Sequence, residues 1–188
     1  MSFRAKAIPT VYNDVQFRSR LEARWAAFFD IVGWGWDYEP FDLDGYIPDF
    51  VLKFYKPLIV EVKPIYKWPC LVADCRDPHC RHDWELAADI KKIRSSGWDG
   101  EAIIVGSAWW HGDAGSPLLG KFVQSDIFPD DAVGFVCNQC NQASIHAGYG
   151  LFECRFAGCG DGDHHIGDEI DPSLWRMAGN RVQWKAPK

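Results

Sequence analysis

YIPDFVLKFYKPLIVEVKP, residues 46–64, contains two apolar stretches separated by a polar turn. In the first stretch, 47–52, side chains alternate between two faces, as they do along a β-strand. The second stretch, 58–63, alternates in the same way, with apolar residues on one face and charged residues interrupting the other. The segment between them, 53–57, suits a hairpin turn. The sequence therefore predicts a β-hairpin at the centre of the fold.

Three charged side chains gather on this hairpin. Glu61 and Lys63 are two residues apart on one strand, so they project from the same face. A charge inside an apolar strand is costly unless it is paired or bound to a metal. Asp49, on the preceding strand, falls close to Glu61 in the hairpin, and adjacent carboxylates repel unless a cation accompanies them. The three together indicate a cation site. Taken singly, Glu61 and Lys63 would be explained by an ion pair, and Asp49 by a place in a turn.

Residues 18–32, RSRLEARWAAFFDIV, precede the hairpin and have the periodicity of an amphipathic helix. The apolar positions repeat every 3.6 residues along one face; they are Leu21, Trp25, Phe28, Phe29 and Val32. Gly33 supplies a stop, and a short strand is expected at 36–39. Glu22 lies at the edge of the apolar face, so it either leans toward the sheet or remains a charge on the helix surface.

The segments after the hairpin complete one core. After an irregular stretch, Asp83 is a good N-cap for a helix over 83–96. The apolar stripe of this helix is expected to consist of Trp84, Ala87, Ala88 and Ile90. Residues 101–107, EAIIVGS, have the composition of a buried strand. The expected order is α-β-β-β-α-β, an α/β fold with a mixed sheet, in which a right-handed crossover joins the last two strands in parallel.

The pattern weakens in the C-terminal part of the chain. Residues 108–135 contain clusters of Gly, Pro and Asp and are expected to be loop with short pieces of order. Residues 136–166 hold four of the seven cysteines and are expected to form a small metal-stabilised module. The tail, 170–188, is expected to pack against the main body through Trp175 and Trp184.

Four cysteines in this part have a spacing similar to that of a zinc ribbon; they are Cys137, Cys140, Cys154 and Cys159. Two such pairs bring four thiolates into a tetrahedron around Zn²⁺. The second pair is looser than usual, and the nearby His164 or His165 could replace a thiolate. A structural role is favoured, because four protein ligands leave no open position for chemistry.

A second group of cysteines follows the hairpin, in the insertion 64–82. Its candidate ligands for a second Zn²⁺ are Cys70, Cys75, Cys80 and His82, with His79 nearby. The spacing matches no strong pattern, so some of these thiols could be free. An iron–sulfur cluster is a further alternative. A metal at this position would hold a loop beside the charged hairpin.

Composition and charge narrow the class of protein. The net charge of −6 argues against a generally basic nucleic-acid binder, yet residues 53–94 carry nine basic and six acidic groups. The chain has no apolar run of 18 residues and no signal-peptide pattern, so we expect a cytoplasmic protein without a membrane span. Seven cysteines in a reducing compartment favour metal binding over disulfides.

The run SRLEARWAAFFD…YEPFDLDGYIPDFVL…LIVEVKP resembles the PD-(D/E)XK nuclease superfamily, and within it phage-encoded nucleases and the endonuclease subunit of heteromeric transposases. The shared patterns are S-x-L-E at 19–22, YEP at 38–40, Y-x-PDF at 46–50 and EVKP at 61–64. The resemblance covers about residues 15–107. It implies a restriction-endonuclease-like core, expected here over 1–135, followed by a zinc-ribbon-like module and tail over 136–188.

The same resemblance implies a function. It implies that Asp49 and Glu61 bind Mg²⁺ or Mn²⁺, that Lys63 positions the attacking water, and that Glu22 helps to hold the metal or its waters. We therefore expect a metal-dependent DNA endonuclease, with a phage or bacterial origin. The alternatives are a catalytically silent module that binds nucleic acid or protein, and a subunit that cuts only with a recombination, transposition or replication partner.

Overall fold

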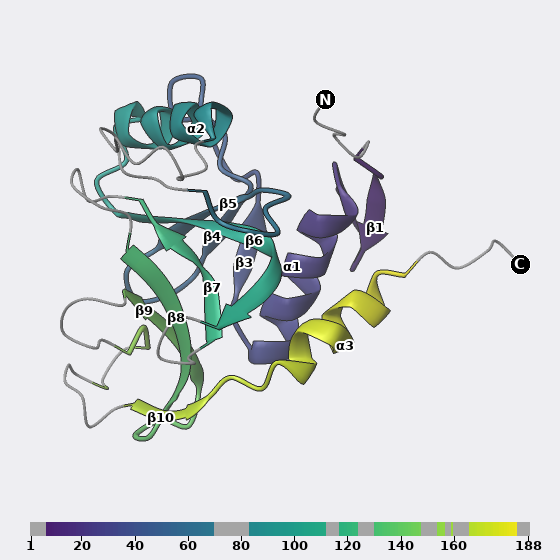
Figure 1. Ribbon diagram of the computed structural model, residues 1–188, viewed down its shortest axis with the longest axis vertical. Helices are drawn as coiled ribbons and strands as arrows, with labels where there is room; N and C mark the ends of the chain where they lie inside the picture. The colour runs from purple at the N-terminus through teal and green to yellow at the C-terminus, as the bar shows by residue number, and fades with distance from the viewer. Residues whose placement is uncertain are drawn as a thin grey trace, which may run out of the picture.

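The structure, a computed structural model, describes residues 7–69, 83–111, 117–123, 130–147, 154–156, 159 and 166–183 (Figure 1). Its elements in chain order are β1 (Thr10–Tyr12), β2 (Val15–Phe17), α1 (Arg20–Val32), β3 (Trp36–Tyr38), β4 (Phe50–Leu52), β5 (Leu58–Val62), α2 (Trp84–Ser95), β6 (Glu101–His111), β7 (Pro117–Phe122), β8 (Asp130–Cys137), β9 (Ala143–Ala147), β10 (Ile166–Glu169) and α3 (Ser173–Arg181). The segment from α1 to β6 has the predicted order α-β-β-β-α-β. The fold is mixed α/β.

Eight of the described strands form one mixed, mostly antiparallel sheet. Its order is β10-β8-β7-β6-β5-β4-β3, and β9 pairs with β8. The predicted hairpin is confirmed, because β4 and β5 pair antiparallel with Phe50 opposite Val60. The predicted parallel pairing is confirmed as well, because β5 runs parallel to β6 with Glu61 opposite Ile104. The small β1–β2 hairpin stands apart from this sheet.

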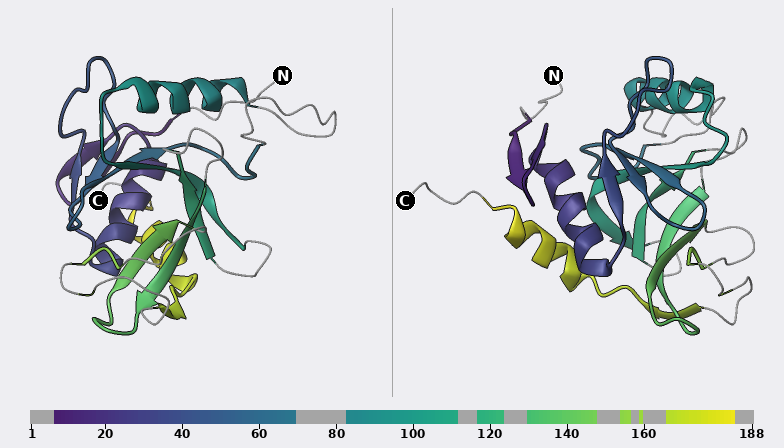
Figure 2. Two further views of the ribbon diagram at one scale, coloured as in Figure 1. Left: turned by 90° about the vertical axis from the view of Figure 1, so that its left-hand side faces the viewer. Right: turned by 180° about the vertical axis from the view of Figure 1, so that it is seen from behind.

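Helices cover both faces of the sheet around β4, β5 and β6. One hydrophobic core joins α1 and α3 to the face that carries Phe50, Leu52 and Val60. A second core joins α2 to the opposite face, which carries Ile59 and Ile104. Helices α1 and α3 lie side by side, away from α2 (Figure 1 and Figure 2). None of the helices in the described parts of the chain is long and apolar enough to cross a membrane.

Helix α1 begins and ends through local signals. The hydroxyl group of Ser19 accepts a hydrogen bond from the Glu22 N–H at 3.1 Å, which caps the first turn. Gly33 adopts a left-handed φ of 77°, and the predicted stop at this glycine is confirmed. Trp25 and Phe28 are buried as predicted. These two rings also pack against Trp175 of α3, which confirms that this part of the tail folds back onto the main body.

The predicted stripe of α2 is wrong in detail. Ala87 and Ala88 are exposed, and the buried face consists of Leu86, Ile90 and Ile93. Burying a Leu or Ile removes far more apolar surface from water than burying an Ala, so the larger side chains face the sheet. The side chain of Trp84 lies outside the described residues.

The expectation of mostly loop over 108–135 is wrong where the structure describes this stretch. Strand β6 continues to His111, and β7 and β8 extend the sheet beyond it. Gly120, one of the glycines that suggested a loop, serves close packing. A Cβ atom at Gly120 would collide with the carbonyl oxygen of Ile104 on the neighbouring strand, so glycine lets the two strands approach.

The expected boundary between residues 135 and 136 falls inside β8, which spans Asp130–Cys137. Strands β9 and β10 both pair with β8, so the cysteine-bearing part shares one sheet with the core. Trp184, which was also expected to pack on the core, lies outside the described residues.

Candidate active site and cysteine centre

Asp49 is the most buried of the predicted site carboxylates. It lies just before β4 and is 4% exposed. The hairpin register pairs Phe50 with Val60, so one residue further along it places Asp49 opposite Glu61. Its Oδ2 atom accepts a hydrogen bond from the Val62 N–H at 2.7 Å, and its Oδ1 atom is bound by the guanidinium group of Arg18. One carboxylate oxygen is therefore held by the backbone of β5 and the other by a long side chain from outside the hairpin.

Glu61 and Lys63 project from the same end of β5. The Lys63 ammonium group is 2.9 Å from Glu61 Oε1 and 2.8 Å from Oδ2 of Asp89 on α2. The hydroxyl group of Tyr46 donates a hydrogen bond to Glu61 Oε2 at 3.0 Å. The carboxylates of Asp49, Glu61 and Asp89 and the ammonium group of Lys63 thus lie together at the C-terminal end of β5, next to α2.

Burial and like charge perturb the ionisation of this cluster. Burial, then the charge of Glu61, raises the pKa of Asp49 to about 7, although the Val62 N–H and Arg18 oppose the shift. Burial lowers the pKa of Lys63, but the charges of Glu61 and Asp89 outweigh it and the net shift is upward. Burial, followed by the charge of Glu61, raises the pKa of Tyr46. The Lys63 ammonium group is thus held in its charged form.

Glu22 is buried, as expected for a carboxylate that leans inward from α1. Its Oε2 atom accepts a hydrogen bond from the Tyr38 hydroxyl group at 2.6 Å, and its Oε1 atom accepts one from Ser19 at 2.6 Å. Arg18 links it to Asp49: the Arg18 Nε atom is 4.0 Å from Glu22 Oε2, while Nη2 binds Asp49. Glu22 therefore belongs to the rim of the cluster and reaches Asp49 through a guanidinium group.

Three residues of this cluster were not predicted from the sequence: Arg18, Tyr46 and Asp89. Tyr46 is the first residue of the pattern at 46–50 and Arg18 directly precedes the pattern at 19–22, but neither carries a chemical signal of its own. Asp89 does carry one. It lies three residues after Leu86 and four before Ile93, which makes it an acidic residue at the edge of the buried stripe of α2.

A cysteine centre lies at the end of β8. The Sγ atoms of the four cysteines, Cys137, Cys140, Cys154 and Cys159, all lie within 4.8 Å of one another. The Sγ–Sγ distances are 4.0 Å for Cys137 and Cys159 and 3.7 Å for Cys140 and Cys154. Four thiolates on a tetrahedral Zn²⁺ would be about 3.8 Å apart. The predicted set of four is therefore brought together and can bind a zinc ion.

A tight turn of the backbone presents the first two thiols. The Asn141 N–H donates to the Cys137 carbonyl oxygen at 2.7 Å, and Asn141 has a left-handed φ of 56°. Burial raises the pKa of the Cys137 thiol, but backbone N–H groups of Cys140 and Gln139 outweigh it and lower the pKa overall. N–H groups that point at a sulfur atom stabilise its thiolate form, which is the form that binds a metal.

Arg155 ties the cysteine centre to the sheet. It follows Cys154, is 5% exposed, and forms a two-pronged ion pair with Glu101 at the start of β6. Its Nε atom donates to the Ile145 carbonyl oxygen at 2.9 Å, and its own carbonyl oxygen accepts from the Tyr55 N–H at 3.1 Å. The second cysteine pair is therefore fixed to β6, β9 and the β4–β5 turn.

Among the described residues, the four cysteines are the only group in which three or more potential metal-ligand atoms lie this close together. The carboxylates around Asp49 do not form such a group, and Arg18 and Lys63 supply their positive partners. The proposed second cluster, with Cys70, Cys75, Cys80 and His82, lies outside the described residues, as do His79, His164 and His165.

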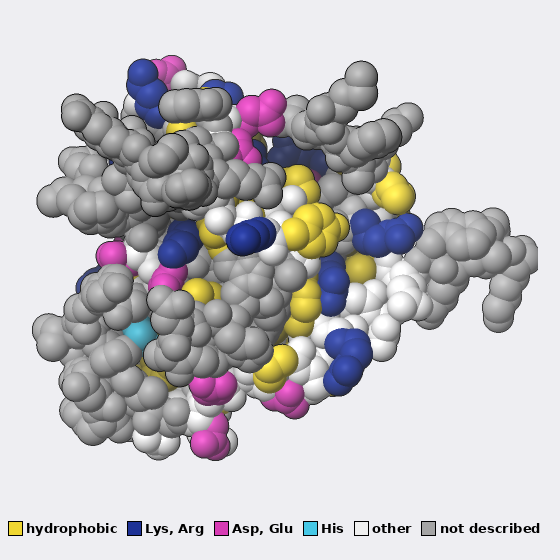
Figure 3. All heavy atoms as spheres, viewed as in Figure 1, with side chains coloured by type: hydrophobic (Ala, Val, Ile, Leu, Met, Phe, Trp, Pro, Cys, Tyr) yellow, Lys and Arg dark blue, Asp and Glu magenta, His cyan; other side chains and the backbone are white. Residues whose placement is uncertain are grey.

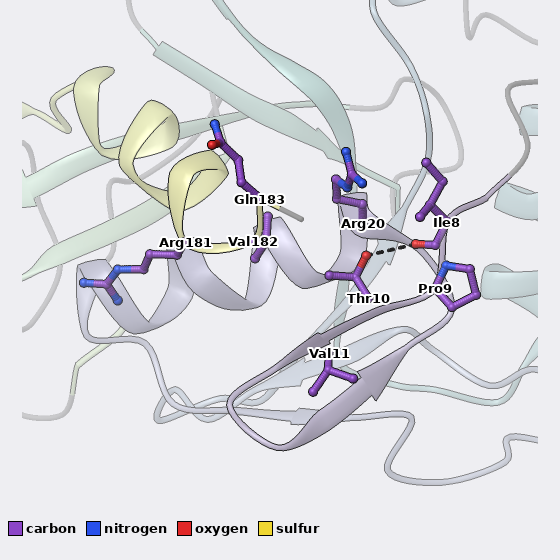
Figure 4. Close-up of a pocket in the computed structure, with 8 residues that line it drawn as sticks. All are labelled: Ile8, Pro9, Thr10, Val11, Arg20, Arg181, Val182 and Gln183. Carbon is purple, nitrogen blue, oxygen red and sulfur yellow. Dashed lines mark hydrogen bonds between the residues drawn. The ribbon is translucent and has the colours of Figure 1, made fainter. Parts of the chain in front are cut away.

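The described surface offers no continuous basic face in the view of Figure 3. There the described Lys and Arg side chains are scattered among acidic and hydrophobic ones. A separate hollow of about 340 Å³ lies between β1 and the end of α3, with Arg20 on its wall (Figure 4). In that view Arg181 points away from Arg20, so the two guanidinium groups do not converge. None of the predicted site residues lines this hollow.

Comparisons of the chain with protein-family models, with curated proteins and with solved structures found no match. The functional assignment therefore depends on the arrangement of the residues themselves.

Proposed function

We propose that the chain is a divalent-metal-dependent nuclease that hydrolyses phosphodiester bonds of DNA. In this proposal the segment from α1 to β6 is a restriction-endonuclease-like core of the PD-(D/E)XK type, and the C-terminal cysteines form a structural, zinc-ribbon-like centre. The element order of the core and the sequence patterns at 19–22, 46–50 and 61–64 support the assignment.

One observation carries the proposal: a buried aspartate faces a glutamate across a β-hairpin, with a lysine ammonium group beside them. Asp49 and Glu61 occupy opposite positions in the continued register, and their like charges contribute to the raised pKa of Asp49. Lys63 lies two residues beyond Glu61 on the same face and contacts it at 2.9 Å. Two carboxylates at facing positions of a hairpin repel each other, so they would not be expected if their only role were to stabilise the fold.

The donor atoms suit a hard cation. Asp49 and Glu61 offer carboxylate oxygens, which Mg²⁺ and Mn²⁺ prefer, and Mg²⁺ needs only one or two protein carboxylates because it keeps several waters. Asp49 Oδ2 is committed to the Val62 N–H, which leaves Oδ1 to face a cation. A bound divalent cation would supply Lewis acidity and lower the pKa of water near the scissile bond.

The chain's own residues then have distinct roles. Asp49 and Glu61 would hold the cation, and Glu22 with Tyr38 would shape the rim of the site. Lys63 donates a hydrogen bond to the attacking water and stabilises negative charge on the phosphate. Water forms the new bond to phosphorus, the bond to the leaving sugar oxygen breaks, and a proton passes to that oxygen.

A second candidate is a module that binds nucleic acid or a partner protein without cutting. It is favoured by the ion pairs of the cluster, because Arg18 already neutralises Asp49 and Lys63 already neutralises Glu61. In a silent module these pairs would be permanent structural contacts. A nuclease requires that at least the Arg18 pair can open.

The experiment is a cleavage assay on supercoiled, linear and branched DNA in Mg²⁺ or Mn²⁺, with the zinc-loaded full chain and its Lys63→Ala variant. The proposal predicts cleavage by the parent and a loss of about 100-fold or more in the variant. Binding of the same DNA without cleavage by the folded parent would support the second candidate. A partner-dependent nuclease would also lack activity alone but would cut once the co-purified partner was added.

A further inference from the structure

Arg18 occupies an unusual position at the rim of the charged cluster. Its Nη2 atom binds Asp49 Oδ1, while its Nε atom is 2.8 Å from Glu39 Oε1 and 4.0 Å from Glu22 Oε2. A single guanidinium group therefore serves three carboxylates. One of the three is the buried aspartate that we assign to the cation.

The oxygen atom that Arg18 holds is the one that a cation needs. Asp49 Oδ2 is bound to the Val62 N–H at 2.7 Å, and this bond belongs to the β4–β5 hairpin, so it persists as long as the hairpin does. Oδ1 is the remaining oxygen, and it is bound by Arg18. A divalent cation and a guanidinium group repel each other, so the two compete for the same atom.

The geometry also gives Arg18 freedom to leave. Its side chain is 60% exposed, whereas that of Asp49 is 5% exposed. Arg18 lies between β2 and α1, and its main chain is anchored separately, since its N–H points to the Glu22 carboxylate and to the Tyr38 hydroxyl at 3.2 Å each. The guanidinium group can therefore swing outward without breaking a helix or strand.

We infer that Arg18 is an exchangeable counter-ion: it neutralises Asp49 until a divalent cation binds, and it then turns to a phosphate group of the DNA backbone. This inference rests on the proposed nuclease function and adds a substrate-binding residue to it. A guanidinium group suits the exchange, because its planar fork pairs equally well with a carboxylate and with a phosphate. A permanent structural ion pair would make neither exchange.

The test is the affinity of the free protein for Mn²⁺, measured by electron paramagnetic resonance for the parent, Arg18→Gln and Arg20→Gln. Arg20 is the matched control: it is exposed, lies two residues away, lines the separate hollow of Figure 4, and loses the same charge. We expect Arg18→Gln to bind Mn²⁺ about tenfold more tightly than Arg20→Gln, since a competing cation has been removed. Arg18→Lys, which keeps the charge, should fall between them.

DNA binding supplies a second readout, measured by fluorescence anisotropy in a Lys63→Ala background so that the duplex stays intact. Without divalent cation, adding Arg18→Gln should change DNA affinity no more than adding Arg20→Gln does. With Mn²⁺, it should weaken DNA binding by about fivefold relative to that control. Tighter metal binding together with weaker DNA binding is a pattern that simple misfolding does not produce.

Equal Mn²⁺ affinity in the two glutamine variants would overturn the inference while leaving the nuclease proposal intact, because Mn²⁺ would still bind at Asp49. Weaker Mn²⁺ binding in Arg18→Gln would overturn it too, since Arg18 would then support the site instead of competing for it. Absence of Mn²⁺ binding in the parent and in every variant would remove the proposed nuclease function itself.

Discussion

The ammonium group of Lys63, the residue that follows β5, is 2.8 Å from the carboxylate of Asp89 on α2, so a helix on one face of the sheet fixes the direction of a lysine at the end of a central strand. The same ammonium group also contacts Glu61 at 2.9 Å. In the proposed reaction Lys63 must point to the water and phosphate. Asp89 therefore acts as a positioning residue that works through Lys63.

Replacing Asp89 with Asn should lower kcat about tenfold, less than removing the lysine itself, because the ammonium group remains but is no longer fixed. The charge of Asp89 contributes to the raised pKa of Lys63, so the variant should lose the lysine proton at lower pH. The basic limb of the pH–rate profile should therefore shift to lower pH. Glu85→Gln, exposed one turn earlier on α2, is the control, and an equal shift in that variant would contradict the positioning role.

The ionised carboxylate of Asp49 should lower the stability of the folded chain, because it is buried and lies near Glu61. Its pKa is about 7 in the folded chain against an ordinary value of 3.8, so between these pH values the folded state binds more protons than the unfolded state. Stability from this group is complete below about pH 4 and is lost as pH rises through about 7.

Asp49→Asn removes this titration. At pH 8, without divalent cation, the variant should be more stable than the parent by about 1–3 kcal/mol, and the difference should shrink toward pH 4. Urea denaturation at several pH values measures it. A variant that is less stable at pH 8, or that keeps the parent's pH slope, would show that Asp49 is a favourable structural ion pair.

The four-cysteine centre should hold one Zn²⁺ per chain and contribute strongly to stability. Removing zinc from a structural site with four thiolate ligands leaves buried thiols without their common ion, and a loss of about 5 kcal/mol would lower Tm by about 10–20 °C. Cys140→Ser and Cys154→Ser should each release the ion, as measured by atomic absorption. A second Zn²⁺ per chain in the parent that is absent from Cys75→Ser would establish the expected second zinc site at 70–82. A zinc-free, equally stable parent would contradict the assignment.

Arg155 should link the cysteine centre to the core energetically. Its guanidinium group is buried and pairs with Glu101, which remains partly exposed. Arg155→Met should destabilise the chain by about 3 kcal/mol, because it leaves the Ile145 carbonyl oxygen and Glu101 without this donor. Arg176→Met, on the exposed side of α3, is the control and should cost less than about 0.5 kcal/mol. Similar losses in both variants, measured by urea denaturation, would show that the ion pair adds nothing.

The core could be predicted from the sequence because its signals are local. The period of Trp25 and Phe28, the stop at Gly33 and the alternation around Asp49 each arise within a few residues. Asp49 and Glu61 could be placed opposite each other because a short hairpin fixes its own register. The cysteine set followed from spacing and thiol chemistry, and the structure brings all four thiols together.

Contacts between distant segments carried no such signal. Arg18 and Asp49 are 31 residues apart in the sequence. Which basic side chain pairs with Asp49 therefore depends on how the start of α1 packs against the hairpin. Asp89 reaches Lys63 only because α2 packs on the face of the sheet at the end of β5. Strand β7 was not predicted, because a glycine such as Gly120 is more common in loops than in strands. In this fold Gly120 lets β7 pack closely against Ile104 on β6.

Hydrolysis of supercoiled DNA in Mg²⁺ by the zinc-loaded parent, by Asp49→Asn and by Asp44→Asn shows most directly whether Asp49 is essential for cleavage. Asp44 is an exposed carboxylate in the preceding turn, at a left-handed φ of 50° that asparagine tolerates well, so it is a matched control. We expect cleavage by the parent and by Asp44→Asn, and none by a folded Asp49→Asn. Undiminished cleavage by Asp49→Asn would contradict the proposed active site.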